Sequence, residues 1–474
     1  MNEFKNNKNK KRIQEKICRK RAKREVKRRK AMKKRNAKKG VQLTYIISKT
    51  INHFFPNLFD RIRKIEDCRK KSEYELVELI TACIAMFIFK EGSRNAFNND
   101  RDEENFKENY KNLFHMRLPH MDTVDNVMRQ LNENELEKLK TDMICNLLKK
   151  KSLHKFRFLG KFFIVAVDGT GIHSFSERHC DQCLTITSKN GKTTYFHNVL
   201  EAKLICSNGF SISLATEWIE NPVGDFDKQD CEKKAFKRLA EKIKKSFPRL
   251  PICITADGLY PSQPFFNICR ENDWHFIVTF KDGNLPSVWE KIHSLPKNVL
   301  TDTCNESDNH PNKKVTSVFR WINGIDYKGY NLSWVECTEN TINIETNKTE
   351  TVRFVHLTDI AVSEDNVSEI SHTGRLRWKI ENEGFNTQKN HGYNLHHKYS
   401  RISYTASKNY YQCLQIAHLI NQLVELSEKF SRLLKGKTTV KHLWKCLIGF
   451  FTYDLIIAED LSCILRKRNQ IRFE

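Results

Sequence analysis

Short apolar runs separated by polar turns occupy the middle of the chain, a pattern typical of buried β-strands. Residues 162–167 and 252–256 form two such runs, and each leads directly into an Asp-Gly pair. Residues 200–206 and 210–218 form two more, joined by Ser207-Asn208-Gly209, which is a hairpin turn signal. These runs predict four strands of one sheet.

Helical periodicity alternates with these strands. Residues 228–247 predict an amphipathic helix, and residues 264–272 predict a second helix, followed by a strand at 275–280. The order β-β-β-α-β-α-β predicts an α/β fold with a mixed sheet, because the early strands suit an antiparallel meander and the later parallel strands need helical crossovers. The apolar face of the first helix consists of Ala235, Phe236, Leu239 and Ile243.

The flanking regions have different patterns. Helices are predicted at 73–90, at 122–128 with Asp122 as the cap, and at 134–151, whereas strands are predicted at 316–322, 330–337 and 351–357. Helical character returns near Arg375 and continues past Tyr410. The predicted units are a basic disordered arm (1–40), a helical, DNA-binding N-terminal domain (41–157), the first part of the catalytic core (158–290), a β-rich insertion (291–370), the rest of the core (371–430) and a C-terminal helical region (431–474).

Positive charge is concentrated at the N-terminus. The chain has a net charge of +25, and residues 1–40 hold 20 Lys or Arg against three Glu. Such a block predicts a disordered arm that clamps the DNA backbone, through residues such as Lys27, Arg28 and Arg29, and releases counterions on binding. A merely solvated tail is the alternative.

Targeting signals and disulfide patterns are not recognisable. The basic arm lacks the apolar centre of a secretory signal, and no stretch approaches the roughly 18–20 apolar residues of a membrane span. The 15 cysteines are scattered without a framework pattern, which favours reduced thiols. These features predict a cytoplasmic protein with no membrane partner.

Two carboxylates stand out in the predicted sheet. Asp168 and Asp257 each follow an apolar run, and in this topology strands one and four are neighbours. Their carboxyl ends would bring the two side chains together, and adjacent carboxylates are hard ligands suited to Mg²⁺. The alternative is that each Asp-Gly pair is only an ordinary turn.

A third carboxylate is expected in the segment Arg377-Trp378-Lys379-Ile380-Glu381-Asn382-Glu383. Together with Val167-Asp168-Gly169-Thr170 and Ala256-Asp257-Gly258-Leu259-Tyr260, this segment resembles the DDE transposases of bacterial insertion sequences. The matching branch has an inserted β-domain and the signature Tyr-x2-Arg-x3-Glu-x6-Lys. The resemblance covers most of residues 115–425, and Arg377 and Glu381 match the signature spacing.

The resemblance implies a ribonuclease H-like catalytic core in which Asp168, Asp257 and Glu381 bind two Mg²⁺ ions, for which Mn²⁺ can substitute. It also implies a reaction in which water cleaves a DNA strand and the freed 3′-hydroxyl is joined to target DNA. The expected partners are double-stranded DNA with terminal inverted repeats, target DNA and a second copy of the chain, in the bacterial cytoplasm at the nucleoid.

The chain departs from the signature at two positions. Gly374 stands at the Tyr position and Gln388 at the Lys position, with Lys389 one residue later. Glu383 remains an alternative third carboxylate, although two residues on a helix are about 200° apart, so only one of the two glutamates can face a shared site.

Arg377 lies one helical turn before Glu381 and is expected to bind a phosphate oxygen, with an ion pair to Glu381 as the alternative. Lys389 is the expected second DNA contact.

Weaker signals are weighed against simpler interpretations. Cys180-x2-Cys183, with His173 and His179 nearby, could bind zinc, but a structural zinc site needs four ligands and no second Cys-x2-Cys pair exists, so free thiols are expected. Glu201 and Lys203 could support the metal site, but alternating polar residues on a half-buried strand are the simpler interpretation. Trp321 and Trp334 could stack on an extruded base, but core aromatics of a small β-domain are favoured.

The predicted function is cut-and-paste DNA transposition. The alternatives are a metal-dependent nuclease that cuts without rejoining and a non-catalytic DNA-binding protein with a decayed core. Both Asp residues and the Arg-x3-Glu helix argue against decay.

Overall fold

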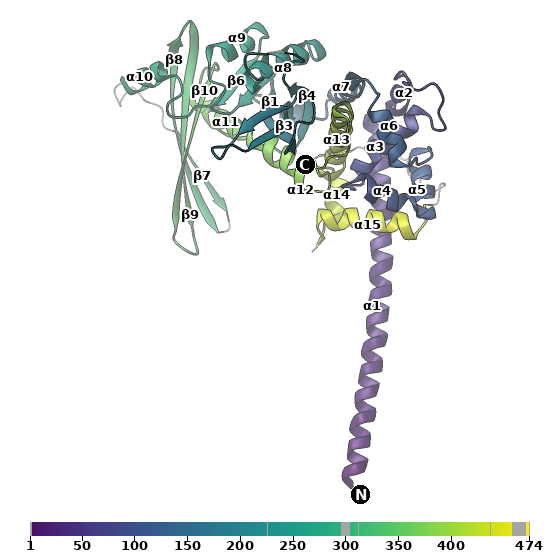
Figure 1. Ribbon diagram of the computed structural model, residues 1–474. Helices are drawn as coiled ribbons and strands as arrows, with labels where there is room; N and C mark the ends of the chain where they lie inside the picture. The colour runs from purple at the N-terminus through teal and green to yellow at the C-terminus, as the bar shows by residue number, and fades with distance from the viewer. Residues whose placement is uncertain are drawn as a thin grey trace.

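The computed structural model describes residues 2–224, 226–294, 304–310, 312–436, 438–456 and 471–473, with only the backbone described for 2–22, 29, 33 and 304–310. Figure 1 shows two halves, a sheet with its covering helices and a bundle of N- and C-terminal helices, with helix α13 (Tyr404–Glu425) between them. A long N-terminal helix, α1 (Asn2–Phe54), extends away from the bundle.

The remaining helices are α2 (Leu58–Arg63), α3 (Leu76–Ile88), α4 (Arg94–Arg101), α5 (Glu104–Phe114), α6 (Met121–Met128), α7 (Glu133–Lys149), η1 (His154–Phe156), α8 (Glu232–Ser246), α9 (Gln263–Glu271), α10 (Pro286–Ser294), α11 (Glu364–Arg375), the π-helix η2 (Ile380–Asn386), α12 (Thr387–Asn390), α14 (Glu428–Leu433) and α15 (Val440–Tyr453). The strands are β1 (Phe163–Phe175), β2 (Leu184–Thr187), β3 (Thr193–Ile205), β4 (Ser211–Ile219), β5 (Ile252–Ala256), β6 (His275–Thr279), β7 (Cys304–His310), β8 (Lys313–Tyr327), β9 (Tyr330–Asn343) and β10 (Thr349–Thr358).

One mixed sheet contains all ten strands, in the order β2-β3-β1-β5-β6-β10-β9-β8-β7, with β4 also paired to β3. Strands β1, β5 and β6 are parallel, whereas β3 is antiparallel to both β1 and β4. The predicted α/β class with a mixed sheet is therefore confirmed, and the predicted pairing of the first and fourth core strands is the β1–β5 pair. Strands β2 and β7 were not predicted.

The two faces of the sheet are covered by different helices. On one face, Val165 and Ile254 belong to the same apolar cluster as Phe236 of α8 and Phe265 of α9. On the other face, Ile164 and Cys253 belong to a second cluster with Ile370 of α11 and Ile380 of η2. Alternation of buried side chains along β1 and β5 thus places η2 directly on the sheet.

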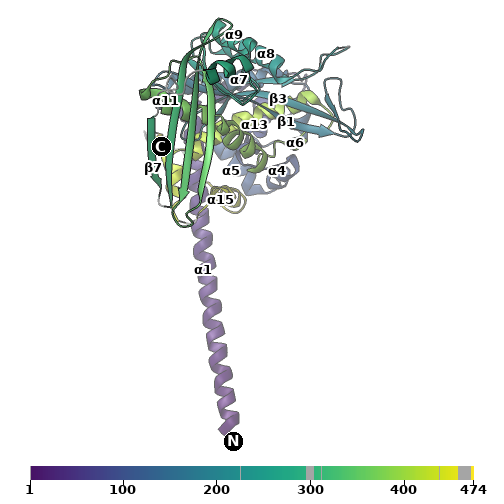
Figure 2. The ribbon, with the colours of Figure 1, turned by 90° about the vertical axis from the view of Figure 1, so that its left-hand side faces the viewer.

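The strands of the predicted β-rich insertion (291–370) are part of the same sheet as the core strands. Strand β10 pairs antiparallel with β6, from His356 opposite Thr279 to Thr358 opposite Ile277, so the insertion strands extend the core sheet. The backbone of β6 would otherwise present unpaired N–H and C=O groups at an open edge, and β10 satisfies them. Figure 2 shows the long β8–β9 hairpin beside β10 and β7.

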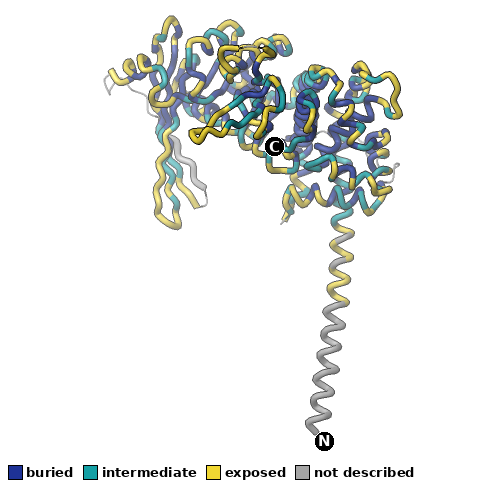
Figure 3. Tube along the Cα trace, in the orientation of Figure 1, coloured by how far each residue is buried: buried dark blue, intermediate teal, exposed yellow. Residues whose placement is uncertain are grey.

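The helical half packs around α13, of which nearly every residue is buried (Figure 3). Asn409 of α13 donates to the carbonyls of Met128 and Leu131, and Asn421 donates to that of Ile88, so α13 binds both α6 and α3 through side-chain amides. The expected helices at 73–90, 122–128 and 134–151 are present as α3, α6 and α7, but His120 caps α6 instead of Asp122.

The predicted N-terminal arm is helical in the structure, where residues 2–54 form one helix. Before Gly40 the sequence contains neither Gly nor Pro, and Lys and Arg are good helix formers. Gly40 lets α1 approach α15 closely, since a Cβ there would lie 2.4 Å from Cβ of Phe450. Among the described residues, no helix is long and apolar enough to cross a membrane.

Candidate active site

Asp168 and Asp257 lie at the same height on neighbouring strands. The parallel pairing of β1 and β5 ends with Ala166 opposite Thr255, and each Asp lies two residues further on. Residues two apart on a strand share a face, and adjacent strands are about 5 Å apart, so both carboxylates emerge at the same edge. Asp257 follows β5 as predicted, but β1 continues through Asp168 to Phe175, because β1 stays paired with β3 there.

Glu381 is the glutamate that approaches this pair. It lies on η2, and its charge raises the pKa of Asp168. Glu383 instead forms an ion pair with Lys379, with Nζ 2.9 Å from Oε1. The structure therefore brings together Asp168, Asp257 and Glu381 and turns Glu383 towards Lys379.

Glu232 is a fourth carboxylate at this edge, and the sequence analysis missed it. It is the first residue of α8, and a Cβ on Gly169 would lie 2.3 Å from its Oε1. Burial raises the pKa of Glu232 to about 7, assisted by the charges of Asp168 and Asp257. Because β4 runs parallel to β1, the helix after β4 must begin at the edge that holds both aspartates, and that topological signal could have identified Glu232.

The charge of this cluster is only partly compensated. Burial raises the pKa of Asp168 to about 6, and Arg377 opposes the shift, with Nη1 3.4 Å from Oδ2. Asp257 accepts from the backbone N–H of Leu259 and lies 3.9 Å from Nζ of Lys281. Among the described residues, the acidic cluster does not form a group of three ligating atoms within 4.8 Å of one another.

The ion pair of Arg377 differs from the predicted alternative, a pair with Glu381. Arg377 is buried, pairs with Asp168 rather than with Glu381, and lies 4.8 Å from the ring centroid of Trp378. Trp378 is 53% exposed, which is unusual for a side chain of that size.

A cavity of about 490 Å³ opens beside the carboxylates. Asp257, Arg377 and Trp378 contribute to its wall, so it adjoins the acidic cluster. Its other charged lining residues are Lys281, Asp282, Arg353 and Arg375. Four cations and two acids line this wall, and each of the four cations is paired with a carboxylate: Arg377 with Asp168, Lys281 with Asp257, Arg353 with Glu336 and Arg375 with Glu339.

Packing explains why Gly374 and Gln388 stand where the transposase signature has Tyr and Lys. A Cβ on Gly374 would lie 2.4 Å from the ring of His356, so no Tyr fits at that position. Gln388 is fully buried and donates to Gln415, so it contacts no DNA, whereas Lys389 is half-buried.

Other predicted site residues lie in the interior. Glu201 is fully buried and accepts from Thr216 and Tyr411, and Lys203 is fully buried and donates to Gln415. Burial lowers the pKa of Lys203 to about 8, and Glu201 partly offsets the shift. These two residues form a polar network beneath the sheet and do not reach the cavity.

Both expected stacking tryptophans are also in the interior, because Trp321 is 5% exposed and Trp334 is 4% exposed. The core interpretation of these residues is therefore supported. On α1, Lys27 and Arg28 are exposed, whereas the side chain of Arg29 lies outside the described residues.

No family model matches the chain, and no curated protein matches it.

We expect Asp168→Asn and Glu232→Gln to stabilise the protein in EDTA at pH 8 more than at pH 5. A folded-state pKa near 6 for Asp168, against an ordinary 3.8, and near 7 for Glu232, against 4.5, means that the fold holds these protons more tightly than the unfolded chain. Each carboxyl therefore destabilises the fold progressively as the pH rises between the two values. The gain should grow by on the order of 1–2 kcal/mol between pH 5 and 8, measured by urea unfolding. An equal gain at both pH values would contradict the burial of these groups.

We expect Trp334→Ala to lower the free energy of unfolding by ~3–5 kcal/mol, because it leaves a cavity in the core. Trp378→Ala is the matched control and should change stability by less than ~1 kcal/mol, because that ring is exposed. Thermal and urea unfolding of the two variants would check this, and equal losses would refute the assignment of Trp378 as a surface residue.

Proposed function

We propose that the protein is a DNA transposase of the DDE type, which cleaves transposon ends and joins them to target DNA. The observation that carries the proposal is the convergence of Asp168, Asp257 and Glu381 from two adjacent parallel strands and a helix packed on the sheet. Three carboxylates in this arrangement are the ligand set of two-metal phosphodiester chemistry.

The strand order supports a ribonuclease H-like core. Five strands of the larger sheet have the order β4-β3-β1-β5-β6. Of these five, β3 runs in one direction and the other four run in the opposite direction. The residues resembling the transposase blocks lie at the equivalent points, which are β1, the end of β5 and η2.

The chemistry of the donor set fits Mg²⁺. Hard carboxylate oxygens are its preferred ligands. Burial raises the pKa of Asp168, the charges of Glu381 and Asp257 add to this shift, and Arg377 opposes it. Asp168, Asp257 and Glu381 would hold the metal, which in such sites activates the attacking oxygen and stabilises the leaving one. Glu232 would accept a proton beside them or orient Asp168.

The wall of the cavity supplies contacts for the DNA backbone. Arg377, Arg375 and Lys281 can bind phosphate oxygens, and guanidinium groups do so bidentately. Trp378 offers an exposed ring beside them, on which an unpaired base can stack. This ring is better placed for stacking than Trp321 or Trp334, for which the sequence analysis favoured core positions.

The π-helix η2 would bring Lys389 to the helix face on which the Lys of the transposase signature is expected. In an α-helix, seven residues after Glu turn by about 700°, which returns the Lys to the same face. Here Lys389 is eight residues after Glu381, and about five of those steps lie in η2, where about 4.4 residues make a turn. The total is about 710°, so Lys389 takes the angular position that Gln388 would have in an uninterrupted α-helix.

A metal-dependent nuclease without strand transfer would use the same carboxylates. The discriminating assay supplies purified protein, Mg²⁺ and a supercoiled donor plasmid carrying the DNA segments that flank the coding sequence. Excision with joining to a target supports transposition, and cutting without joined product supports the nuclease. DNA binding alone, with Asp168→Ala equal to wild type, would indicate a decayed core.

We expect Asp168→Asn, Asp257→Asn and Glu381→Gln to bind DNA ends with wild-type affinity and to lose cleavage by at least ~10³-fold, because each removes a metal-ligating charge. Glu383→Gln is the matched control and should retain cleavage within about tenfold, because Glu383 pairs with Lys379. Single-turnover cleavage and filter binding measure the two effects. If Glu383→Gln lost cleavage and Glu381→Gln retained it, Glu383 would be the third carboxylate.

We expect deletion of residues 2–30 to weaken DNA binding and to lower the slope of log K against log salt, because it removes 15 Lys and Arg. The melting temperature should stay unchanged, because the described side chains of this segment are exposed and packing begins near Ala37. Fluorescence anisotropy at several salt concentrations measures the slope. An unaltered slope would rule out a DNA-clamping role for α1.

A further inference from the structure

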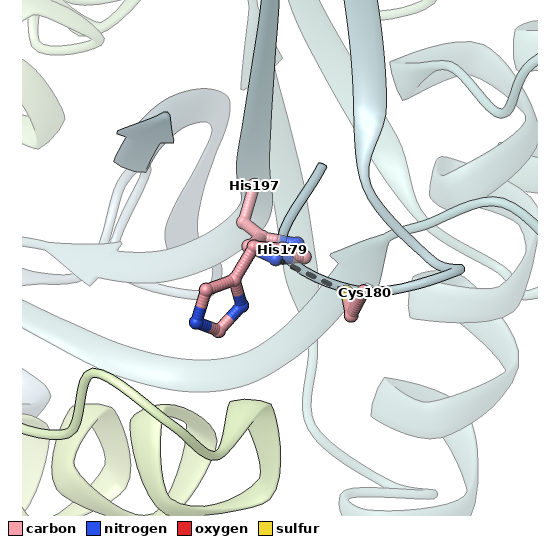
Figure 4. A group of neighbouring side chains, drawn as sticks. All are labelled: His179, Cys180 and His197. Atoms are coloured by element: carbon pink, nitrogen blue, oxygen red, sulfur yellow. Dashed lines mark hydrogen bonds between the residues drawn. The ribbon is translucent and has the colours of Figure 1, made fainter. Parts of the chain in front are cut away.

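A second cluster of ligating side chains lies away from the carboxylates, at the far end of β1 and β3. Cys180 and Cys183 are in the turn after β1, and His197 is on β3, opposite His173. Figure 4 shows His179, Cys180 and His197, with the interaction between His197 and Cys180 drawn as a dashed line. None of these residues takes part in the function proposed above.

Three ligand atoms of this cluster have the spacing of a metal site. Sγ of Cys180 and Sγ of Cys183 are 3.5 Å apart, and each lies 3.4 Å from Nε2 of His197. Zinc–ligand distances of about 2.3 Å to sulfur and about 2.0–2.1 Å to nitrogen, at tetrahedral angles, require separations of about 3.5–3.8 Å. A disulfide would require a sulfur–sulfur distance of about 2.05 Å, and both cysteines are free thiols.

A fourth ligand is available in His179. One of its ring nitrogens lies within 4.8 Å of the ligand atoms of Cys180 and His197. Its Nε2 lies 2.8 Å from the carbonyl oxygen of Arg401 and donates to it, which leaves Nδ1 with a free lone pair. That Nδ1 is buried and has no partner among the described residues. Donation from the second ring nitrogen to a backbone carbonyl is the usual way a metal-binding His is oriented.

The surroundings hold this cluster in place. His197 is 1% exposed and stacks on Tyr404 at the start of α13, with ring centroids 3.9 Å apart. The carbonyl of Cys183 accepts from the side chain of Asn221, which fixes the turn against the end of β4. The sequence analysis named Cys180, Cys183 and His179 as possible zinc ligands but missed His197, which lies 14 residues after Cys183 on another strand.

We propose that Cys180, Cys183, His197 and His179 bind one structural Zn²⁺ ion. On binding, the two thiols release their protons to solvent and coordinate as thiolates. The ion fastens the turn after the active-site strand β1 to β3 and to the start of α13. It has no open coordination position and serves no catalytic step.

The test uses the full chain purified with an affinity tag that contains no His, and measures metal by mass spectrometry. We expect about one zinc per chain in the wild type and in Cys68→Ser, an exposed cysteine outside the cluster. Cys180→Ser and Cys183→Ser should lose at least about fivefold of the bound zinc. His179→Asn should lose zinc as well, whereas loss in His173→Asn alone would make His173 the fourth ligand and refute the assignment of His179.

Cobalt substitution keeps the proposal testable if the variants do not fold. Wild-type protein loaded with Co²⁺ should show the ligand-field and thiolate charge-transfer bands of a tetrahedral site with two sulfur ligands. Wild-type protein that contains no zinc and gives no such bands would overturn the proposal, as would a Cys180–Cys183 disulfide in protein purified without reductant.

Discussion

The parallel pairing of β1 with β5 is the constraint on which the site depends. Four residue pairs, from Phe163 opposite Ile252 to Ala166 opposite Thr255, set the register that brings Asp168 and Asp257 to one height. A shift of one residue would move one carboxylate to the opposite face of the sheet. Apolar clusters on both faces oppose such a shift, because β1 and β5 are buried along their whole paired length.

The same pairing determines what the other elements can contribute. Since β4 and β5 run in the same direction, α8 begins at the carboxyl edge of the sheet and delivers Glu232 there. On the opposite face, the apolar contacts of Ile380 and Phe385 hold η2 against the strands, so that Glu381 faces Asp168. Four acidic side chains thus come to one edge of the sheet, because α8 and η2 pack on its opposite faces through the two apolar clusters. Burial raises the pKa values of Asp168 and Glu232, and the neighbouring carboxylates add to both shifts.

Elements with a local hydrophobic periodicity could be predicted from the sequence. The apolar runs before Asp168 and Asp257 and the amphipathic face of α8 identified the core strands and a covering helix. Features that depend on contacts between segments distant in the sequence could not be predicted. The attachment of β10 to β6, the π-turn after Lys379 and the approach of Glu232 are tertiary features that no local pattern encodes. For the N-terminal arm, charge density predicts disorder, whereas the helix propensity of Lys and Arg favours the helix seen in the structure.

The length of α1 has a consequence for the extent of contact with a partner. At 1.5 Å per residue, the portion of this helix before Ala37 spans roughly 50 Å, about one and a half turns of B-form DNA. If the partner is DNA, as proposed above, a helix of that length would contact a bound duplex at a point well separated from the sheet edge. Nuclease protection would then extend well past the body of the protein, as two protected stretches on the same molecule.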